Sequence, residues 1–548
     1  MTVFATLFAV ALGVTLLTGP LVGLFCHRVG LVDKPDRHRK LHSRNVALGG
    51  GVTVLSGIVA ACLVAFLFND AWLVALSEQW RSVVGATAGF TLLVVVGLYD
   101  DIYRMRGRNK LVGQILAAIL VAAGGTRIDV VSVFGGQYAL GVFGMGVTVV
   151  WLLATINSFN LVDGADGLAT TLGIVLATVT AGVAMTLGQH FEAAIALILA
   201  GALLGFLMMN RPPARMFLGD SGSMSIGLLL GTLAVRASTK GPTTVLLATA
   251  VSIWSLLFFD VAMAIARRKL TGRSIFAADR AHLHHVLLQR GWSEVRVAVV
   301  LGLAAFATGI GAMAAVAIHS EAIAIVVTLA VLASFLIAGW FGRSELRILS
   351  DSVRRNVRSV STRLNGRTET HPAVNDGVQM RIYGRRDWDR LWKELLAFTA
   401  RFNLVQMQLN ISIPSLQEEF HATWKGKRSI DDRTKWNVRV PIQTSSGPIG
   451  HALIVGDSVQ SDLTPGEAFE LLRKLDAMAD DVCADAAELA TAELRTSEPS
   501  ATDVKADLKA DTPPDASVLP KRGERLGESG SSIVLTADER DRAIAGKL

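Results

Sequence analysis

Long apolar runs separated by short polar loops dominate the first 342 residues of the chain. Many of the runs reach the ~17–25 residues that a helix needs to cross a membrane, and a few are shorter. This pattern predicts an α-helical polytopic membrane protein with about eleven transmembrane helices in residues 1–342. The expected spans lie near residues 3–25, 46–68, 82–99, 111–124, 141–156, 167–187, 193–209, 222–235, 243–266, 297–317 and 321–341.

The pattern changes after residue 342. Residues 343–375 form a basic linker, and residues 376–490 alternate strand-like with amphipathic helical stretches, which predicts a small α+β domain. Residues 491–548 are rich in charged and small residues and have almost no aromatic ones, so we expect a disordered tail. In the α+β domain, strands are expected at 378–383, 404–413, 436–442 and 450–455, and helices at 388–401 and 465–489.

Composition and charge favour a membrane protein over one that binds nucleic acid. The chain is 51% hydrophobic, with a mean hydropathy of +0.45 and a net charge of +7. The loops after the odd-numbered spans hold 19 Lys and Arg residues, whereas the alternate loops hold 4. The positive-inside rule therefore predicts that the first set of loops and the C-terminal domain are cytoplasmic and that the N-terminus is outside. No Lys or Arg precedes the first run, so we expect a retained span and not a cleaved signal.

Polar motifs gather in the loops that this orientation places in the cytoplasm. Asp100 and Asp101 follow the third span, where adjacent carboxylates are costly unless they meet a cation or water, and Lys110 follows nine residues later. A solvated loop with local Asp–Arg pairs is the alternative. Asp220 stands between glycines at a helix start, where backbone N–H groups also favour phosphate. The alternative there is simple helix capping by Asp220 or Ser221.

Two further loops carry candidate ligands. Residues 157–166 contain no Lys or Arg and place Asn157, Asn160, Asp163 and Asp166 in a short turn. Such oxygen ligands suit Mg²⁺ or a polar substrate, with a capped turn as the alternative. The last loop suits an anionic phosphate, with a zinc site or a structural role as alternatives; its candidates are Arg273, Arg280, His282, His284 and His285.

Two expectations concern the neighbourhood of this last loop. His282 and His285 are expected to share a helix face. Asp260, inside the ninth span, is either a functional residue or the partner of a nearby arginine.

Together these motifs resemble the polyprenyl-phosphate N-acetylhexosamine-1-phosphate transferases of glycosyltransferase family 4. The resemblance covers about residues 1–342. It departs from the family at two places: Asn45-Val-Ala-Leu48 stands where the family carries prolines, and Leu257 stands where the family has a proline three residues before the intramembrane Asp260. The His-x-His-His form is similar to the bacterial undecaprenyl-phosphate GlcNAc-1-phosphate transferase branch more than to the muramyl-pentapeptide branch. The motifs are Asp100-Asp101, Asn157-x-x-Asn160-x-x-Asp163-Gly-x-Asp166, Phe217-Leu-Gly-Asp220 and Gly272-Arg-Ser…Asp279-Arg-x-His282-x-His284-His285.

The resemblance implies transfer of N-acetylhexosamine 1-phosphate from a UDP-sugar to polyprenyl (undecaprenyl) phosphate at the cytoplasmic membrane face, with release of UMP. It makes Asp220 the ligand of Mg²⁺, or alternatively Mn²⁺, with Asn160 as helper. Asp100 and Asp101 become candidate bases, and Asp163 and Asp166 contact the nucleotide or order the metal site. The residues expected to bind substrate are Lys40, Lys110, Asn157, Asn160, Arg273, Arg280, His282, His284 and His285.

The same resemblance implies a bacterial inner-membrane enzyme that starts cell-envelope polysaccharide synthesis. UDP-N-acetylglucosamine is the default donor, other N-acetylated hexosamines are alternatives, and a homodimer is a further expectation. A polytopic transporter or permease is the competing class, but it would need polar residues near mid-membrane, and Asp260 is the one clear intramembrane acid. A membrane receptor would leave the loop carboxylates unexplained.

Overall fold

A computed structural model provides the fold of the chain. It describes residues 2–33, 45–68, 70–133, 136–239, 246–270, 282–340, 378–383, 388–402, 404–413, 418–426, 435–444, 447–457, 477 and 479–480.

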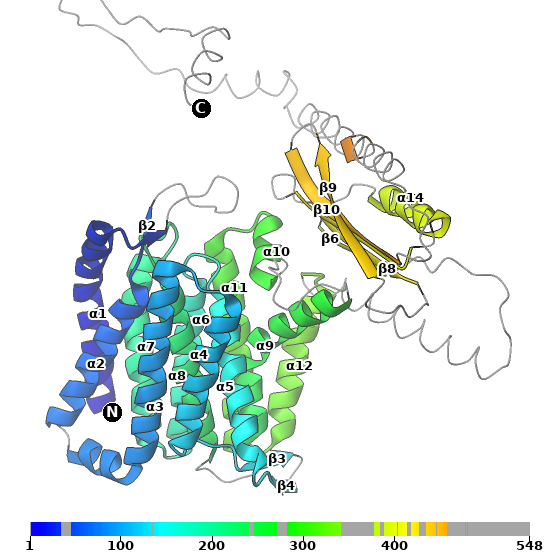
Figure 1. The fold of residues 1–548 in the computed structure, drawn as a ribbon. Helices are drawn as coiled ribbons and strands as arrows, with labels where there is room; N and C mark the ends of the chain where they lie inside the picture. The colour runs from blue at the N-terminus through cyan, green and yellow to red at the C-terminus, as the bar shows by residue number, and fades with distance from the viewer. Residues whose placement is uncertain are drawn as a thin grey trace, which may run out of the picture. The chain divides into compact units, whose positions relative to one another are not determined.

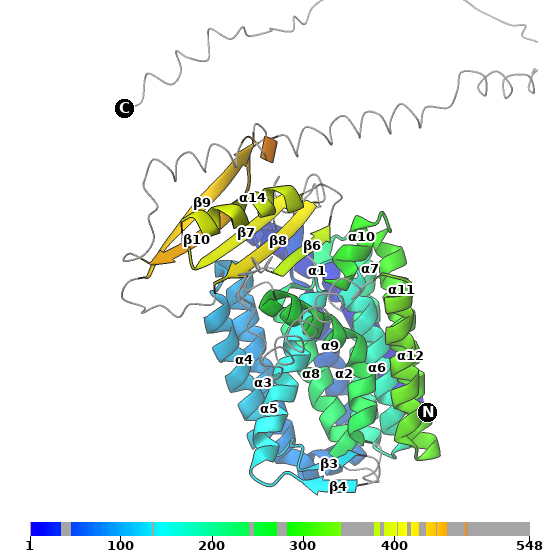
Figure 2. The same cartoon turned by 90° about the vertical axis from the view of Figure 1, so that its right-hand side faces the viewer.

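The apolar runs form a bundle of long helices (Figures 1 and 2). Each of the eleven expected spans lies within one helix or overlaps most of it. Large side chains such as Leu17, Leu67 and Val150 are exposed on these helices, as expected where a surface meets lipid. The helices are α1 (Thr2–Val29), α2 (Gly50–Phe68), α3 (Asp70–Tyr103), α4 (Gly107–Ala123), α5 (Phe143–Val162), α6 (Leu168–Thr186), α7 (His190–Asn210), α8 (Gly219–Thr239), α9 (Leu246–Leu270), α11 (Glu294–Ile318) and α12 (Glu321–Ile337).

Eight of the helices in the described part are long and apolar enough to cross a membrane, which makes the chain a multi-pass membrane protein. The helices α4 and α12 have 17 residues each, and α8 begins with a polar turn that contains Asp220. The full number of eleven spans therefore stays a prediction.

Two of the helices that extend beyond their apolar runs carry motif residues on the extension. α3 continues to Tyr103, so Asp100 and Asp101 lie on its last turn, and α5 continues to Val162, so Asn157 and Asn160 are helical. The expectation that residues 157–166 form a short turn is wrong for its first half. Hydropathy detects where a helix leaves the apolar layer, whereas backbone hydrogen bonding lets the helix continue beyond it.

The motif-bearing helix ends lie together at one end of the bundle, at the top of Figure 1. A small sheet with strand order β1-β2-β5 lies at this end and joins β1 (Val32–Asp33), β2 (Val46–Leu48) and β5 (Met216–Phe217). The short helix α10 (Leu283–Gln289) is also at this end, and the hairpin of β3 (Val130–Val133) and β4 (Gly136–Ala139) is at the other.

Glycines bring α2 and α3 against the start of α8. A Cβ on Gly97 of α3 would lie 2.3 Å from the Cα of Ser221, and a Cβ on Gly51 of α2 would lie 2.6 Å from the backbone N of Gly222. Side chains at these positions would push the helices apart, so the glycines permit the approach that places Asp101 beside Asp220.

The C-terminal region has its own hydrophobic core. Its sheet is antiparallel, with strand order β6-β8-β7-β10-β9, and α14 (Trp388–Arg401) contributes the fully buried Trp388 and Trp392. The helix expected at 388–401 and the four expected strands are present, and β8 is an additional strand. The strands are β6 (Val378–Tyr383), β7 (Gln406–Ile413), β8 (Glu418–Lys425), β9 (Lys435–Thr444) and β10 (Gly447–Asp457).

The remaining C-terminal expectations lie outside the described residues. They are the linker 343–375, nearly all of the helix expected at 465–489, and the tail 491–548.

Candidate active site

A cavity of about 1050 Å³ opens among the helix ends that carry the polar motifs. Its wall is strongly acidic. The sequence singled out five of its carboxylates but missed Asp33, at the end of β1, and Glu294, at the start of α11, because neither belongs to a clustered motif. The acidic residues that line it are Asp33, Asp100, Asp101, Asp163, Asp166, Asp220 and Glu294.

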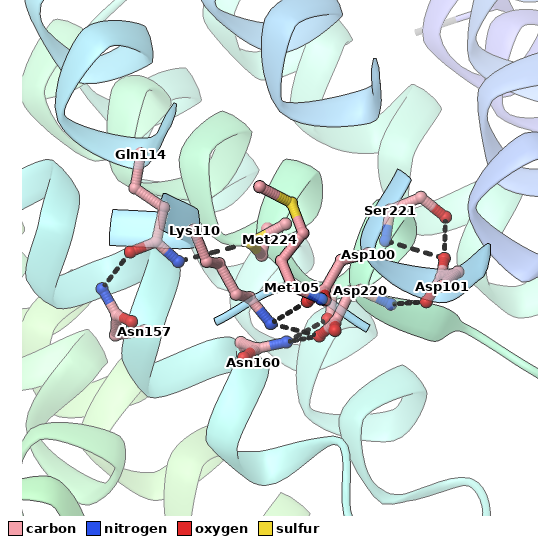
Figure 3. Close-up of polar contacts among 11 residues, drawn as sticks. Asp100, Asp101, Met105, Lys110, Gln114, Asn157, Asn160, Asp220, Ser221 and Met224 are labelled. Atoms are coloured by element: carbon pink, nitrogen blue, oxygen red, sulfur yellow. Dashed lines mark hydrogen bonds and ion pairs between the residues drawn. The ribbon is translucent and has the colours of Figure 1, made fainter. Parts of the chain in front are cut away.

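Lys110 links two of these carboxylates (Figure 3). Its Nζ lies 3.1 Å from Oδ2 of Asp100 and 2.7 Å from Oδ1 of Asp220. Asn160 donates from Nδ2 to the same Asp220 oxygen at 2.6 Å and to Oγ of Ser223 at 2.8 Å. The last turns of α3 and α5 and the first turns of α4 and α8 thus meet at Asp220.

Asp101 caps the start of α8. Its Oδ1 accepts a hydrogen bond from the backbone N–H of Asp220 at 2.8 Å, and its Oδ2 accepts from the backbone N–H and the hydroxyl of Ser221 at 3.2 and 2.9 Å. The alternative that Asp220 or Ser221 caps its own helix is therefore wrong. A carboxylate from α3 satisfies these N–H groups and leaves the Asp220 side chain to face Lys110 and Asn160.

Asn157 is one step removed from the cavity. Its Nδ2 donates to Oε1 of the buried Gln114 at 3.0 Å, and Gln114 donates to the sulfur of Met224 at 3.3 Å (Figure 3). Gln114 lies one helical turn after Lys110 on α4. The sequence did not single out Gln114, although a glutamine inside an apolar run is a signal of a buried polar contact.

The loop after α5 is tied to the end of α7. Oδ2 of Asp166 accepts from the backbone N–H of Ala214 at 2.7 Å, and Oδ1 of the buried Asn210 accepts from Gly167 N at 3.1 Å and from Thr170 Oγ1 at 2.6 Å. Asp166 thus orders this loop while it also lines the cavity. Asn210 was missed in the sequence, where it appears only as the last residue of an apolar run.

Asp163, at the end of α5, has a strongly raised pKa. Burial, followed by the charges of Asp220, Asp101 and Asp166, raises its pKa to about 8. The proton that Asp163 keeps at neutral pH relieves repulsion among these acids, and a bound cation would do the same.

We expect the thermal stability of the metal-free protein in detergent to fall as pH rises from about 5 to 8. Asp163 ionises near pH 3.8 when unfolded but near pH 8 when folded, so the folded state holds the extra proton in this window. The contribution of this proton to stability is fully present below the unfolded-state pKa of Asp163 and is lost as pH rises through its folded-state pKa. Tm measured against pH should therefore decline less steeply in Asp163→Asn, and the two curves should run parallel above about pH 8. Equal slopes at all pH values would contradict the raised pKa.

The histidines split into buried and cavity-lining groups. His282 is fixed by Asp260. Oδ2 of Asp260 lies 3.1 Å from Nδ1 of His282, and Oδ1 of Asp260 accepts a hydrogen bond from the N–H of Leu283 at 2.9 Å. Burial and the neighbouring histidines lower the pKa of His284, which is therefore neutral at physiological pH, and only His285 of the three lines the cavity.

This geometry answers one of the sequence expectations and bears on a second. His282 precedes α10 in an extended conformation, so the expectation that it shares a helix face with His285 is wrong. Asp260 contacts His282 and the first residue of α10, Leu283. Lys40, Arg273 and Arg280 lie outside the described residues.

The donor chemistry of the acidic cluster fits Mg²⁺. Asp220 and Asp100 offer carboxylate oxygens, and Asn160 keeps its Oδ1 after donating through its NH₂ group. Among the described residues, no three His, Cys, Asp or Glu side chains converge into a complete metal site. Mg²⁺ is commonly held by one or two carboxylates together with substrate phosphates, so a pair of acids is sufficient.

Comparisons with known proteins agree with the motifs. The family model described as Glycosyl transferase family 4 matches residues 83–238. A probable undecaprenyl-phosphate N-acetylglucosaminyl 1-phosphate transferase of Bacillus subtilis is 30% identical over 56% of this chain and 83% of its own length. A decaprenyl-phosphate N-acetylglucosaminephosphotransferase of Mycobacterium tuberculosis is 33% identical over 52% and 76%, respectively. A phospho-N-acetylmuramoyl-pentapeptide-transferase of Moorella thermoacetica is 34% identical over 52% and 89%.

Proposed function

The chain belongs to glycosyl transferase family 4, and we propose that it transfers N-acetylglucosamine 1-phosphate from UDP-N-acetylglucosamine to a polyprenyl phosphate in the membrane. The observation that supports this most is the meeting of Asp100, Lys110, Asn160 and Asp220 at one end of a membrane helix bundle. One substrate is soluble and anionic, and the other carries its phosphate at the membrane surface. A site at the end of the bundle is accessible to both.

The reaction needs positioning more than proton removal. An oxygen of the lipid phosphate attacks the β-phosphorus of the UDP-sugar, the bond between the two phosphates breaks, and UMP leaves with the bridging oxygen. A phosphate monoester has its second pKa near about 6 and is mostly dianionic at neutral pH, so a strong base has little to remove. Asp101 is occupied by the start of α8, which makes it a positioning residue and not a base. Lys110 offers a positive charge to phosphate oxygens.

We infer that Mg²⁺ is the cofactor and that Asp220 holds it, with Asp100 or Asn160 beside it. When bound, the ion neutralises charge on the diphosphate and on departing UMP. The protein's own contribution is the capped start of α8, which fixes the carboxylate of Asp220, and the amide of Asn160, which orients that carboxylate.

The proposed location is the bacterial inner membrane, with the cavity and the C-terminal region in the cytoplasm and the N-terminus outside. The excess of Lys and Arg at the cavity end supports this orientation. Single cysteines introduced at Glu294 and at His319, at the two ends of α11, separate the alternatives. An impermeant thiol reagent applied to intact cells should label position 319 and not position 294; the reverse pattern would overturn the orientation.

Identity to relatives does not separate the sugar donors, because the muramoyl-pentapeptide relative is as similar as the N-acetylglucosamine ones. The proposal for N-acetylglucosamine rests on the His-x-His-His motif. Purified protein should be incubated with undecaprenyl phosphate and, separately, UDP-N-acetylglucosamine, UDP-N-acetylgalactosamine and UDP-N-acetylmuramoyl-pentapeptide. UMP and lipid-linked product should form fastest with the first donor, and product only with the third would refute the choice of sugar.

We expect deletion of residues 343–548 to leave the transferase active. All residues that line the described cavity lie between Asp33 and Glu294, and the comparisons cover about half of the chain. UMP release by the truncated protein should be close to that of the full chain at equal amounts in the membrane. A truncated protein that inserts normally but is inactive would show that the C-terminal region is required for catalysis.

A further inference from the structure

Arg104, the residue that follows α3, has an unusual backbone conformation. Its φ is 54°, in the left-handed region that residues with a Cβ rarely adopt. Among the described residues, only His319 shares this property without being a glycine, with a φ of 58°. Strained residues of this kind persist where the surrounding structure imposes them, and they cluster at functional sites.

Two hydrogen bonds to Asp100 hold the turn at Arg104. The backbone N–H of Arg104 donates to the carbonyl oxygen of Asp100 at 2.8 Å, and the N–H of Met105 donates to Oδ1 of Asp100 at 2.5 Å. The other oxygen of Asp100 faces Lys110. The turn that carries Arg104 is therefore built on the carboxylate that also contacts the proposed phosphate-binding lysine.

Arg104 is the only Lys or Arg among the described residues that line the cavity, whose wall holds seven carboxylates. Its side chain is exposed and forms no ion pair within the described part of the chain. An anionic substrate entering so acidic a cavity needs a cation near the entrance, and a guanidinium can hold a phosphate through two parallel hydrogen bonds.

The neighbours of Arg104 place it at the level of the lipid headgroups. Tyr99 and Tyr103 precede it on α3, are 52% and 66% exposed, and have ring centroids 4.7 Å apart. Exposed tyrosines at a helix end are typical of the membrane–water interface, where the phosphate of a polyprenyl carrier also lies.

We propose that Arg104 binds the phosphate of the polyprenyl carrier at the mouth of the cavity, and that its left-handed backbone is retained because it serves this contact. This inference rests on the proposed transferase function. It assigns the lipid phosphate to Arg104 and not to Lys110. Arg104 thereby becomes a lipid-binding residue outside the polar motifs that define the resemblance to the family.

Arg104→Gly is the informative variant, because glycine relieves the backbone strain and removes the guanidinium together. We expect its Tm to rise while its KM for undecaprenyl phosphate rises by about 10- to 100-fold, the loss typical of a hydrogen bond to a charged group. The KM for the UDP-sugar should stay within about twofold, since the diphosphate meets other groups. Arg104→Lys should recover part of the affinity for the lipid.

His319→Gly is the matched control. It relieves the same kind of strain at the C-terminal cap of α11, outside the cavity, so its Tm should rise without any change in either KM. An Arg104→Gly protein that behaves like His319→Gly, with a higher Tm and unchanged kinetics, would overturn the proposal and reduce Arg104 to a strained turn. A rise in the KM for the UDP-sugar alone would equally overturn the assignment to the lipid.

A binding measurement separates this inference from the proposed function. Undecaprenyl phosphate added to detergent-solubilised protein should raise the Tm of the wild type by mass action, and the increase should be lost in Arg104→Gly. Loss of this Tm shift supports the inference whether or not any UDP-sugar gives product. Absence of product with every UDP-sugar would count against the proposed reaction and not against the role of Arg104. A shift that is equal in both proteins would refute the role of Arg104.

Discussion

Asp220→Asn should lower the turnover of the enzyme by about 10²- to 10³-fold while the protein still folds and inserts. A metal ligand supplies several kcal/mol of charge stabilisation, and each 1.4 kcal/mol corresponds to about tenfold in rate. The cost to folding should stay at about 1 kcal/mol, because the cap of α8 comes from Asp101, and asparagine loses the partly exposed ion pair with Lys110 but can still accept from Asn160. The measurement is UMP release against Mg²⁺ concentration, with Tm as the check on folding.

Asp101→Asn is the comparison for this result. It weakens the cap by replacing one accepting oxygen with an NH₂ group that faces the donors of Ser221. We expect a lower Tm and a loss of activity that excess Mg²⁺ does not restore, whereas excess Mg²⁺ should partly restore Asp220→Asn. An Asp220→Asn enzyme with near-normal turnover and unchanged Mg²⁺ dependence would end the metal assignment.

Lys110→Met should produce the second large defect, a fall in turnover of about 100-fold, typical of removing one preorganised charged donor from an active site. Lys110 lies within 3.1 Å of the carboxylates of Asp100 and Asp220, and methionine keeps the length of the side chain but not its charge. The apparent affinity for Mg²⁺ should not fall, because the lysine competes with the metal for Oδ1 of Asp220. Initial rates against Mg²⁺ and UDP-sugar concentration measure both effects.

Arg108→Met is the matched control for Lys110→Met. It removes one positive charge from the same helix, but Arg108 is exposed, and residues two apart on a helix do not share a face. Its activity should be near that of the wild type. If the two variants were equally impaired, the loss would come from the general charge at the membrane surface and not from the contact with Asp220.

The C-terminal region shows which elements can be predicted from the local sequence pattern. The strands β6, β7, β9 and β10 and the helix α14 were expected at nearly their observed positions, because alternation and amphipathic periodicity are local properties of a chain. The strand β8 was missed although Phe420, Ala422 and Trp424 alternate with polar residues, because the strand begins with two glutamates and its apolar alternation is only three residues deep. Its pairing with β6 and β7 provides the hydrogen bonds that stabilise it as a strand, and this pairing cannot be predicted from its composition.

For the membrane region, the amino-acid sequence by itself determined the multi-pass helical class, the order of the helices, the family, and the chemical types of the site residues. Hydropathy and motif spacing are carried by neighbouring residues, so they can be read without coordinates. The end of the bundle at which Asp100, Lys110, Asn160 and Asp220 meet also followed from the sequence, since successive spans must alternate in direction.

Only the tertiary structure decided what each polar group does. Asp100 and Asp101 are adjacent in sequence, yet one faces Lys110 and the other caps a helix 119 residues away, because successive side chains on a helix point in different directions. The pairing of Asp260 with His282 and the left-handed backbone of Arg104 likewise depend on contacts between elements. Packing across the bundle sets these partners, and the sequence of each helix alone contains no record of which neighbour it will meet.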